Sequence, residues 1–239
     1  KSLTEGIIHA GANLDARVNL RWIDSEKIEE SNVNELLKDV DGILVAGGFG
    51  ERGVLGKMQA IKFARENKIP YLGICLGMQL AMIEFARDVL GLEDANSMEF
   101  NKECKNPIIY LIDSFIDAHG KKQIRTHTSP LGGTMRLGAY NCDIKPKTLL
   151  AEIYGNAKSV KERHRHRYEF NSDYTKEFEA AGMECVGTNP ESGLIEIVEI
   201  PEKKWYIGTQ FHPEYSSTVL HPHPLFLDFV KTAIAAQDK

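Results

Sequence analysis

The stretch Tyr71–Gln79, with the sequence YLGICLGMQ, constrains the fold more than any other part of the chain. Residues 71–75 are apolar or small and follow Pro70, which predicts a short buried strand. From Met78 onward, apolar residues recur at helical spacing. Cys75 therefore lies where a strand turns abruptly into a helix. Such a turn is typical of a nucleophile elbow, here with Cys in place of Ser.

A thiol in this position has two interpretations. The N-terminus of a helix lowers the pKa of a thiol and supplies donors for a developing oxyanion, which predicts a nucleophile. A single Cys at the end of a buried strand can equally be an inert core residue. The other cysteines, Cys104, Cys142 and Cys185, form no C-x-x-C spacing, so neither a zinc site nor a disulfide framework is indicated.

Strands and helices alternate in the first part of the chain. The pattern predicts strands at Val18–Ile23, Asp41–Ala46 and Tyr71–Cys75, and helices at Glu26–Val40, Val54–Lys68 and Met78–Leu90. This order is typical of a parallel sheet with right-handed crossovers. The rest of the chain carries strands linked by turn-rich loops. We expect an α/β fold, with an open, mostly parallel sheet, flanking helices and an added antiparallel part, as one domain over residues 1–239.

The charge and hydropathy of the chain exclude several functions. Because 29 Lys and Arg face 34 Asp and Glu, the net charge is −5, and nothing indicates nucleic acid or a membrane surface as a partner. No apolar run approaches the roughly 18 residues of a transmembrane helix, and no signal peptide is visible. These features and the reduced thiols predict a cytoplasmic enzyme.

The segment 210–214, QFHPE, offers what a catalytic Cys needs. A Cys nucleophile requires a base, and the base requires an orienting group. His212 and Glu214 follow a predicted strand and, two residues apart in an extended segment, point to the same side. Glu214 can hold one imidazole nitrogen while the other faces the thiol. The sequence therefore predicts a triad of Cys75, His212 and Glu214.

The segment Gly48–Gly53, GFGERG, permits a different function. It matches G-x-G-x-x-G between a strand and a helix, the fingerprint of a dinucleotide site. That fingerprint requires an acidic residue at the tip of the next strand, about 20 residues on, where this chain has Cys75. The glycines can instead let backbone N–H groups approach an oxyanion beside the thiol.

Three segments together resemble the class I, triad-type glutamine amidotransferases: Gly47–Gly50, Gly73–Gln79 and Phe211–Glu214. Further segments resemble the glutaminase half of the CTP synthases: Asn96–Phe100, Leu131–Gly138 and Glu162–Glu169. The resemblance covers essentially the whole chain. Ala46 is a departure, since many members have Pro there.

The resemblance implies a role for each matching residue. Cys75 would be the nucleophile, His212 the acid and base, and Glu214 its orienting group. The backbones of Gly48 and Leu76 would form the oxyanion hole. Glu99 would hold the α-ammonium and Arg167 the α-carboxylate of glutamine, which suits their charges. The full set of implied glutamine-binding residues is Gly48, Leu76, Gly77, Met78, Gln79, Glu99 and Arg167.

The resemblance also implies a reaction and its partners. L-Glutamine would be hydrolysed through a Cys thioester, and its ammonia used for ATP-dependent amination of UTP to CTP. ATP and Mg²⁺ would bind a preceding synthetase domain, because residues 1–239 contain no Walker A motif and begin, without Met, like the tail of a helix. No cofactor or metal is expected in these residues. GTP would activate the full enzyme, CTP would inhibit it, and it would form a homotetramer.

Other interpretations stay open. The chain could be the glutaminase domain of another class I amidotransferase, or a catalytically silent regulatory module. His164 and His166 could bind a metal or belong to a basic strand face, although no third ligand has fitting spacing. His221–His223 is expected to be a loop. Gly120–Gly133, which contains Arg125, resembles the family's lid over the glutaminase site.

Overall fold

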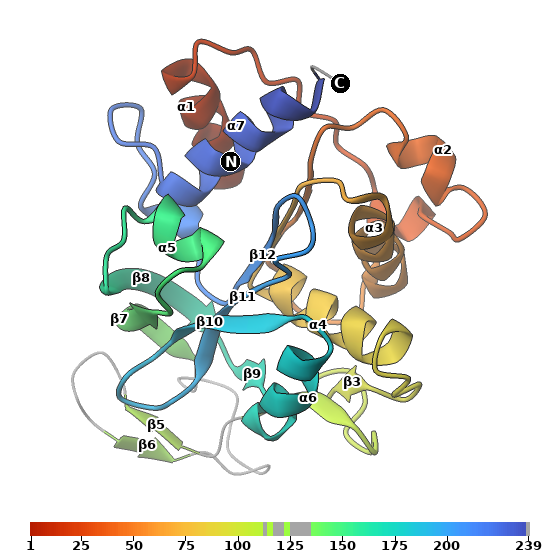
Figure 1. Cartoon of the computed structure of the whole chain (residues 1–239). Helices are drawn as coiled ribbons and strands as arrows, with labels where there is room; N and C mark the ends of the chain where they lie inside the picture. Colours follow the sequence, from red (N-terminus) through yellow and green to blue (C-terminus); the bar gives the residue numbers. More distant parts are fainter. Residues whose placement is uncertain (112–113, 117–121, 125–134, 238–239) are drawn as a thin grey trace.

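A computed structural model describes residues 1–111, 114–116, 122–124 and 135–237 of the chain (Figure 1). Its α-helices are α1 (Ser2–Asn13), α2 (Val33–Leu37), α3 (Val54–Asn67), α4 (Leu76–Asp88), α5 (Leu149–Ile153), α6 (Thr175–Ala180) and α7 (Pro224–Gln237). Its strands are β1 (Ile43–Val45), β2 (Tyr71–Ile74), β3 (Asn96–Ser97), β4 (Pro107–Leu111), β5 (Ser114–Ile116), β6 (Lys122–Ile124), β7 (Arg136–Ile144), β8 (Ser159–His166), β9 (Tyr168–Phe170), β10 (Glu184–Thr188), β11 (Ile195–Glu199) and β12 (Tyr206–Thr209). Short 3₁₀ turns are η1 (Ser25–Lys27), η2 (Ser172–Tyr174) and η3 (Pro213–Tyr215).

A seven-stranded sheet with the order β1-β2-β12-β11-β10-β7-β8 lies at the centre of the described structure (Figure 1). β1, β2 and β12 run parallel. The other four of its six strand pairings are antiparallel. The predicted α/β fold with flanking helices and an added antiparallel part is confirmed. The parallel share of the sheet is smaller than predicted, because hairpin-type returns replace helical crossovers in the second half of the chain.

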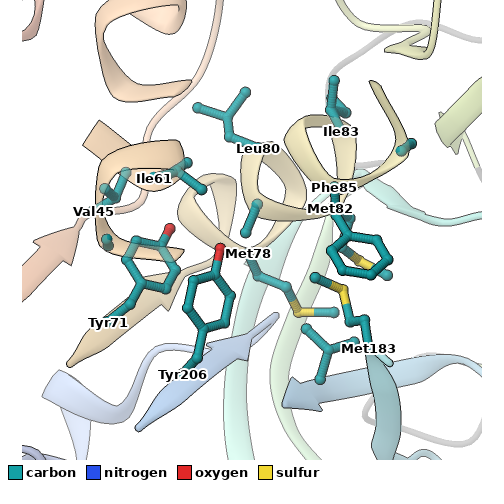
Figure 2. Packing of buried hydrophobic residues seen from close by; sticks show 14 of the residues in the cluster. Val45, Ile61, Tyr71, Met78, Leu80, Met82, Ile83, Phe85, Met183 and Tyr206 are labelled. Atoms are coloured by element: carbon teal, nitrogen blue, oxygen red, sulfur yellow. The ribbon is translucent and has the colours of Figure 1, made fainter. Parts of the chain in front are cut away.

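Helices cover both faces of this sheet. One hydrophobic cluster contains residues of α1, α5 and α7, and a second contains residues of α2, α3, α4 and α6. Successive strand residues face opposite clusters: Tyr71 and Tyr206 face one, whereas Leu72 and Ile207 face the other. The rings of Tyr71 and Tyr206 stack with centroids 4.5 Å apart (Figure 2). β2 and β12, which are paired neighbours in the sheet, are thus held side by side.

The helix α4 is buried along nearly its whole length. Every residue from Leu76 to Ala86 is buried, as expected for a helix that is apolar on all sides. Its buried charge, Glu84, accepts hydrogen bonds from Arg65 Nε of α3 at 3.1 and 3.0 Å. This packing fixes the helix whose first turn follows Cys75.

Two predicted elements are wrong. Val18–Ile23 forms no strand, because it pairs with no strand in the described part of the chain, and Trp22 is 76% exposed. The predicted helix Glu26–Val40 is reduced to η1 and α2. It breaks because the side chain of Asn32 accepts from the N–H of Glu29 and donates to the carbonyl of Lys27, replacing helical hydrogen bonds.

Among the described helices, none has both the length and the apolar character needed to span a bilayer. Arg125 and most of Gly120–Gly133 lie outside the described residues, as does Leu131–Thr134 of the Leu131–Gly138 motif.

Candidate active site

Cys75 joins β2 directly to α4, as predicted. Its backbone has φ 53° and ψ −104°, a strained conformation for a residue other than glycine. Its N–H donates to the carbonyl of Thr209 at 2.7 Å, and its carbonyl accepts from the N–H of Gln79 at 3.1 Å. Because a neighbouring strand and the first helical turn both hold the backbone, the strained turn is maintained.

Two glycines allow the chain to come close around this turn. A Cβ on Gly77 would lie 2.1 Å from the carbonyl oxygen of Val45, so α4 can begin against β1 only with glycine there. A Cβ on Gly47 would lie 2.9 Å from His212 Cε1 and 3.4 Å from Cys75 Cβ. Gly47 therefore lies between these two side chains, and a larger residue would push them apart.

His212 is held on three sides. Its Nδ1 lies 2.8 Å from Glu214 Oε1, its backbone N–H donates to the carbonyl of Arg163 at 2.8 Å, and its ring stacks on Tyr215 with centroids 5.3 Å apart. The bond to the carboxylate places a proton on Nδ1 and leaves Nε2 as an acceptor. Nε2 is buried and makes no hydrogen bond within the described residues. This nitrogen is therefore available for a proton.

One cavity of about 190 Å³ brings the predicted triad together. Its described lining comprises Cys75, His212 and Glu214, together with Leu3, Gly47, Gly48, Phe49, Arg165 and Tyr215. A larger cavity of about 280 Å³ lies between α3 and α4 and includes none of the three triad residues. The smaller cavity is the candidate active site because it combines a thiol with an oriented imidazole.

Burial decides the protonation of the thiol. It raises the pKa of Cys75 to about 12, the backbone N–H of Leu76 opposes this, and the carboxylates of Glu169, Glu214 and Glu99 add to it. The helix N-terminus acts on this thiol in the expected direction, since the Leu76 N–H lowers its pKa. Desolvation of the charged form outweighs this one backbone donor, so the net pKa is raised. The thiol is neutral until its proton moves to another group.

Glu99 and Arg167 approach the loop that contains Phe49, a lining residue of this cavity, and Gly50. Glu99 Oε1 accepts a hydrogen bond from the N–H of Gly50 at 3.0 Å, and Arg167 Cζ lies 6.0 Å from the ring centroid of Phe49. Both also act on the phenol of Tyr168, whose pKa is raised by burial and by Glu99 and lowered by Arg167. A negative and a positive side chain thus converge beside the cavity. The Gly50 N–H that a dinucleotide phosphate would use already binds a carboxylate.

Comparison with known proteins identifies the family. A model of the family described as glutamine amidotransferase class-I matches residues 1–232. The chain belongs to this family. A CTP synthase of Campylobacter jejuni subsp. jejuni serotype O:23/36 (strain 81-176) is 60% identical over 238 residues, which are 100% of this chain and 44% of that protein. A CTP synthase of Wolinella succinogenes is 58% identical and covers 98% of this chain and 42% of its own length. The chain spans less than half the length of these relatives.

Solved structures agree with this assignment. The glutaminase domain of Trypanosoma brucei CTPS with bound acivicin has a TM-score of 0.88 and 38% identity, and the match covers 98% of this chain and 87% of that one. A protein of Thermoplasma acidophilum assigned to GMP synthase, with a TM-score of 0.56 and 15% identity over 98% of this chain and 90% of that one, shares the fold. The predicted resemblance to class I amidotransferases, and to the glutaminase half of CTP synthases, is confirmed.

The other predicted glutamine-binding residues differ in whether they reach the cavity. Gly48 lines the cavity, and a Cβ on it would lie 3.4 Å from Leu76 Cδ2, so the two proposed oxyanion-hole residues are neighbours. The cavity lining does not include residues 76–79. Met78 packs in the core beneath β12 (Figure 2). Gln79 donates to the carbonyl of Tyr168 at 2.9 Å and to Gln210 Oε1 at 3.0 Å. The contribution of residues 76–79 to glutamine binding stays a prediction.

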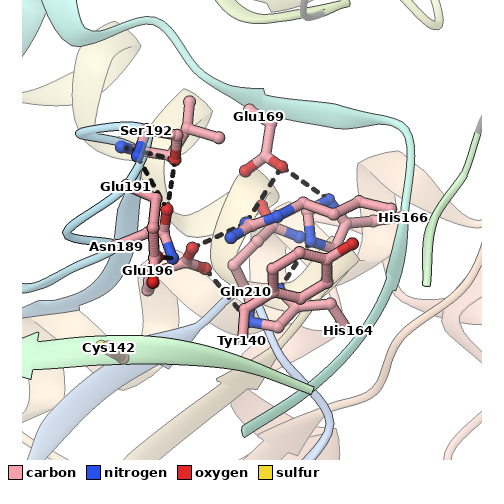
Figure 3. A network of polar contacts seen from close by, with 12 residues as sticks. Tyr140, Cys142, His164, His166, Glu169, Asn189, Glu191, Ser192, Glu196 and Gln210 are labelled. Carbon is pink, nitrogen blue, oxygen red and sulfur yellow. Dashed lines mark hydrogen bonds and ion pairs between the residues drawn. The ribbon is translucent and has the colours of Figure 1, made fainter. Parts of the chain in front are cut away.

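A buried polar network is formed by Arg136, His164, His166, Glu169 and Glu196, and Figure 3 labels its histidines and glutamates. It lies close enough to the candidate site for Glu169 to act on the Cys75 thiol. Arg136 donates to Glu196 Oε1 at 2.6 Å and to Glu169 Oε1 at 3.5 Å. His164 Nδ1 lies 2.8 Å from His166 Nε2, so these two nitrogens bind each other. No group of three or more His, Cys, Asp or Glu in the described part of the chain is arranged to hold a metal ion.

Sequence reasoning missed several lining residues of the candidate active-site cavity. The alternation of side chains along a strand could have identified Arg165. Because β8 buries His164 and His166, Arg165 between them points to the opposite side, where it lines the cavity. Tyr215 directly follows the predicted orienting residue Glu214. Phe49 lies inside the glycine motif Gly47–Gly50, next to the predicted residue Gly48. Leu3 carried no distinguishing signal, since it is an apolar residue far from Cys75 in sequence.

Proposed function

We propose that this protein hydrolyses L-glutamine with Cys75 as nucleophile, His212 as acid and base, and Glu214 as the group that orients His212. The observation that carries the proposal is one cavity lined both by the thiol of Cys75, at a strained strand–helix turn, and by the imidazole of His212, whose Nδ1 is held at 2.8 Å by the Glu214 carboxylate. Glutaminase activity fits this arrangement, because attack on a carboxamide needs a sulfur nucleophile and a group that returns a proton to nitrogen.

In the first step, the thiol proton moves to His212 Nε2 as Sγ attacks the side-chain carbonyl carbon of glutamine. The oxyanion of the tetrahedral intermediate is stabilised by the backbone N–H groups of Gly48 and Leu76, and each such donor typically lowers the barrier by about 2.7–4 kcal/mol. His212 then gives its proton to the departing nitrogen. Ammonia leaves, and a γ-glutamyl thioester remains on Cys75.

In the second step, His212 removes a proton from water, which attacks the thioester. Glutamate leaves and the thiol is restored. Because Glu214 keeps the imidazole in one tautomer, the same nitrogen serves as base and as acid in both steps. Glu99 and Arg167 are proposed to bind the α-ammonium and the α-carboxylate, and residues 76–79 to shape the site through backbone and supporting contacts.

The 60% identity to a CTP synthase supports a further proposal about the acceptor. We propose that residues 1–239 form one glutamine amidotransferase domain whose ammonia serves ATP-dependent amination of UTP to CTP. ATP and Mg²⁺ would bind a synthetase domain that precedes these residues. Activation by GTP, inhibition by CTP, a homotetramer and a cytoplasmic location belong to the same proposal.

Glutamate release from glutamine by the purified protein tests the first proposal. Cys75→Ala should abolish release without changing the melting temperature by more than a few degrees. Cys104→Ala, which alters a half-buried thiol that does not line the cavity, should retain activity. Loss of activity in both variants, or retention in both, would contradict the assignment of Cys75.

Two further measurements separate the alternatives. In the full-length protein, Cys75→Ala should still make CTP from UTP when ammonia is added, because added ammonia bypasses the glutaminase site. Glutamate release without CTP formation would indicate another class I amidotransferase. If the full-length protein releases no glutamate when ATP, UTP and GTP are present, the domain is a silent regulatory module.

A further inference from the structure

We propose that Gln210 is a positioning residue for Cys75: its side-chain amide donates a hydrogen bond to Sγ and directs the thiol proton toward His212. The inference deepens the function proposed above, because it concerns the same thiol. It assigns a role to a residue that precedes the His212–Glu214 pair and does not line the cavity.

The contact lies within the hydrogen-bonding range of sulfur and is fully buried. Gln210 Nε2 lies 3.7 Å from Cys75 Sγ, and Gln210 has no exposed surface. The backbone N–H of Gln210 donates to the carbonyl of Glu196 at 2.8 Å, which fixes the residue at the end of β12. Gln210 is therefore held in contact with the thiol by its backbone bond to the neighbouring strand β11.

The orientation of the amide follows from its neighbours. The carbonyl of Tyr168 can only accept, so the Gln79 atom 2.9 Å from it must be the nitrogen Nε2. The same nitrogen lies 3.0 Å from the side chain of Gln210, where the facing atom must then be the oxygen Oε1. Gln210 consequently presents its nitrogen, not its oxygen, to Cys75. The backbone carbonyl of Tyr168 in β9 thus determines, through Gln79, that Gln210 faces the thiol with a hydrogen-bond donor.

This polarity determines where the thiol proton can point. A carbonyl oxygen at the position of Nε2 would attract the S–H, whereas an N–H there binds a sulfur lone pair. The thiol proton is thereby directed to the cavity, where His212 Nε2 is an acceptor. When the proton has left, the sulfur carries a charge and the bonds from Gln210 and from the Leu76 N–H become stronger.

Several charged or titratable groups lie around this thiol. Glu169, Glu214 and Glu99 disfavour the thiolate, and burial disfavours it most. Arg165 and His212 line the same cavity. The Gln210 amide favours the thiolate and therefore opposes burial and the three carboxylates. Loss of this donor should raise the pH at which the reaction at sulfur becomes fast.

The test is the rate at which iodoacetamide alkylates Cys75 in the intact protein, followed between pH 6 and 10 by mass spectrometry of the Cys75 peptide. Gln210→Met retains the length of the side chain and removes the donor. We expect the rate at pH 8 to fall by about tenfold and the rise of the rate with pH to move to higher pH. Gln210→Glu, which keeps the acceptor for Gln79 and presents an anionic oxygen to sulfur, should lower the rate further.

Two more variants separate positioning from general destabilisation. Gln79→Leu removes the bond that orients Gln210, and a smaller decrease is expected. Asn189→Ala removes another buried side-chain amide, which donates to the carbonyl of Asn141 with a donor–acceptor distance of 2.8 Å and does not contact the thiol. This variant should leave Cys75 alkylation unchanged. Melting temperatures of all variants show how much stability each has lost.

Unchanged alkylation in Gln210→Met, or an equal decrease in Asn189→Ala, would overturn the inference. If Gln210→Met does not fold, Gln210→Glu decides, and alkylation at the wild-type rate would overturn the inference. Because iodoacetamide reacts without glutamine turnover, the result is independent of the glutaminase assay. A protein that releases no glutamate can still show the Gln210 effect, so the two proposals fail separately.

Discussion

Two clusters of histidine and glutamate lie close together in this molecule and differ in how many of their nitrogens are in use. In the cavity, His212 binds Glu214 through Nδ1 and makes no hydrogen bond through Nε2 within the described residues. In the network of Figure 3, His164 and His166 bind each other, and His166 Nδ1 also approaches Glu169 at 3.1 Å. Burial lowers the pKa of both network histidines, so they are neutral.

The difference shows what converts a buried histidine into a reactive one. Both clusters are desolvated and both contain carboxylates, so residue type and burial do not distinguish them. His212 Nε2 and His164 Nε2 both make no hydrogen bond within the described residues. The distinguishing feature is the cavity, whose lining includes His212 and not His164. The other ring nitrogens of the network have internal partners, and His164 Nε2 lies 3.4 Å from Glu196 Oε2 of β11. We therefore expect changes in the two clusters to affect different measured quantities.

The largest expected contrast compares His212→Gln with His164→Gln. His212→Gln should lower kcat for glutamine hydrolysis by about 10⁴-fold, because the base and acid are lost, and change the melting temperature little. His164→Gln should lower the melting temperature by several degrees, because a buried hydrogen-bonded pair is broken, and leave kcat of the folded protein within a few-fold. Steady-state glutamate release and thermal unfolding measure the two effects.

An outcome in which both variants lose activity to the same extent would remove the contrast. The network would then belong to the catalytic site rather than to the fold. Similar losses of stability in both would indicate that His212 is needed for folding.

The next largest effect concerns substrate binding at the edge of the cavity. Arg167→Met should raise KM for glutamine by roughly ten- to a hundredfold with a smaller change in kcat, because a bond to the α-carboxylate acts equally on bound substrate and transition state. Ammonia-dependent CTP synthesis by the full-length protein should be preserved. An unchanged KM would remove Arg167 from the substrate site and leave it as a residue of the bend between β8 and β9.

The contrast between the clusters also explains what could be predicted from the sequence. The elbow around Cys75 and the pair His212–Glu214 are local patterns, and local patterns are visible without a structure. Gln210 adjoins that pair, but its contact with Cys75 depends on β2 and β12 being neighbours. The pairing of Arg136 with Glu196 likewise depends on strands distant in sequence. Val18–Ile23 shows the reverse error, since its alternating pattern predicts a strand but it pairs with no strand among the described residues.

The smallest expected effect tests whether Glu196 carries a proton. His166 Nδ1 lies 3.2 Å from the carbonyl of Tyr168, which can only accept, so Nδ1 holds the proton of that ring. His166 Nε2 is then an acceptor, His164 Nδ1 must donate to it, and His164 Nε2 is left as an acceptor facing Glu196 Oε2. Two acceptors would face each other unless Glu196 were protonated.

The pKa of Glu196 agrees, since burial raises it to about 8 against the opposing effect of Arg136. Because the folded pKa lies above the ordinary value of 4.5, folding takes up a proton between these values. This contribution to stability is fully present below about pH 4.5 and is lost as the pH rises through about 8. Glu196→Gln keeps a donor for His164 and cannot titrate. Urea unfolding of both proteins from pH 5 to 9 should show wild type losing about 1 kcal/mol or more relative to Glu196→Gln. The exposed substitution Glu179→Gln is the control, and a difference between wild type and Glu196→Gln that is flat across this range would mean that Glu196 is ionised in the folded protein throughout.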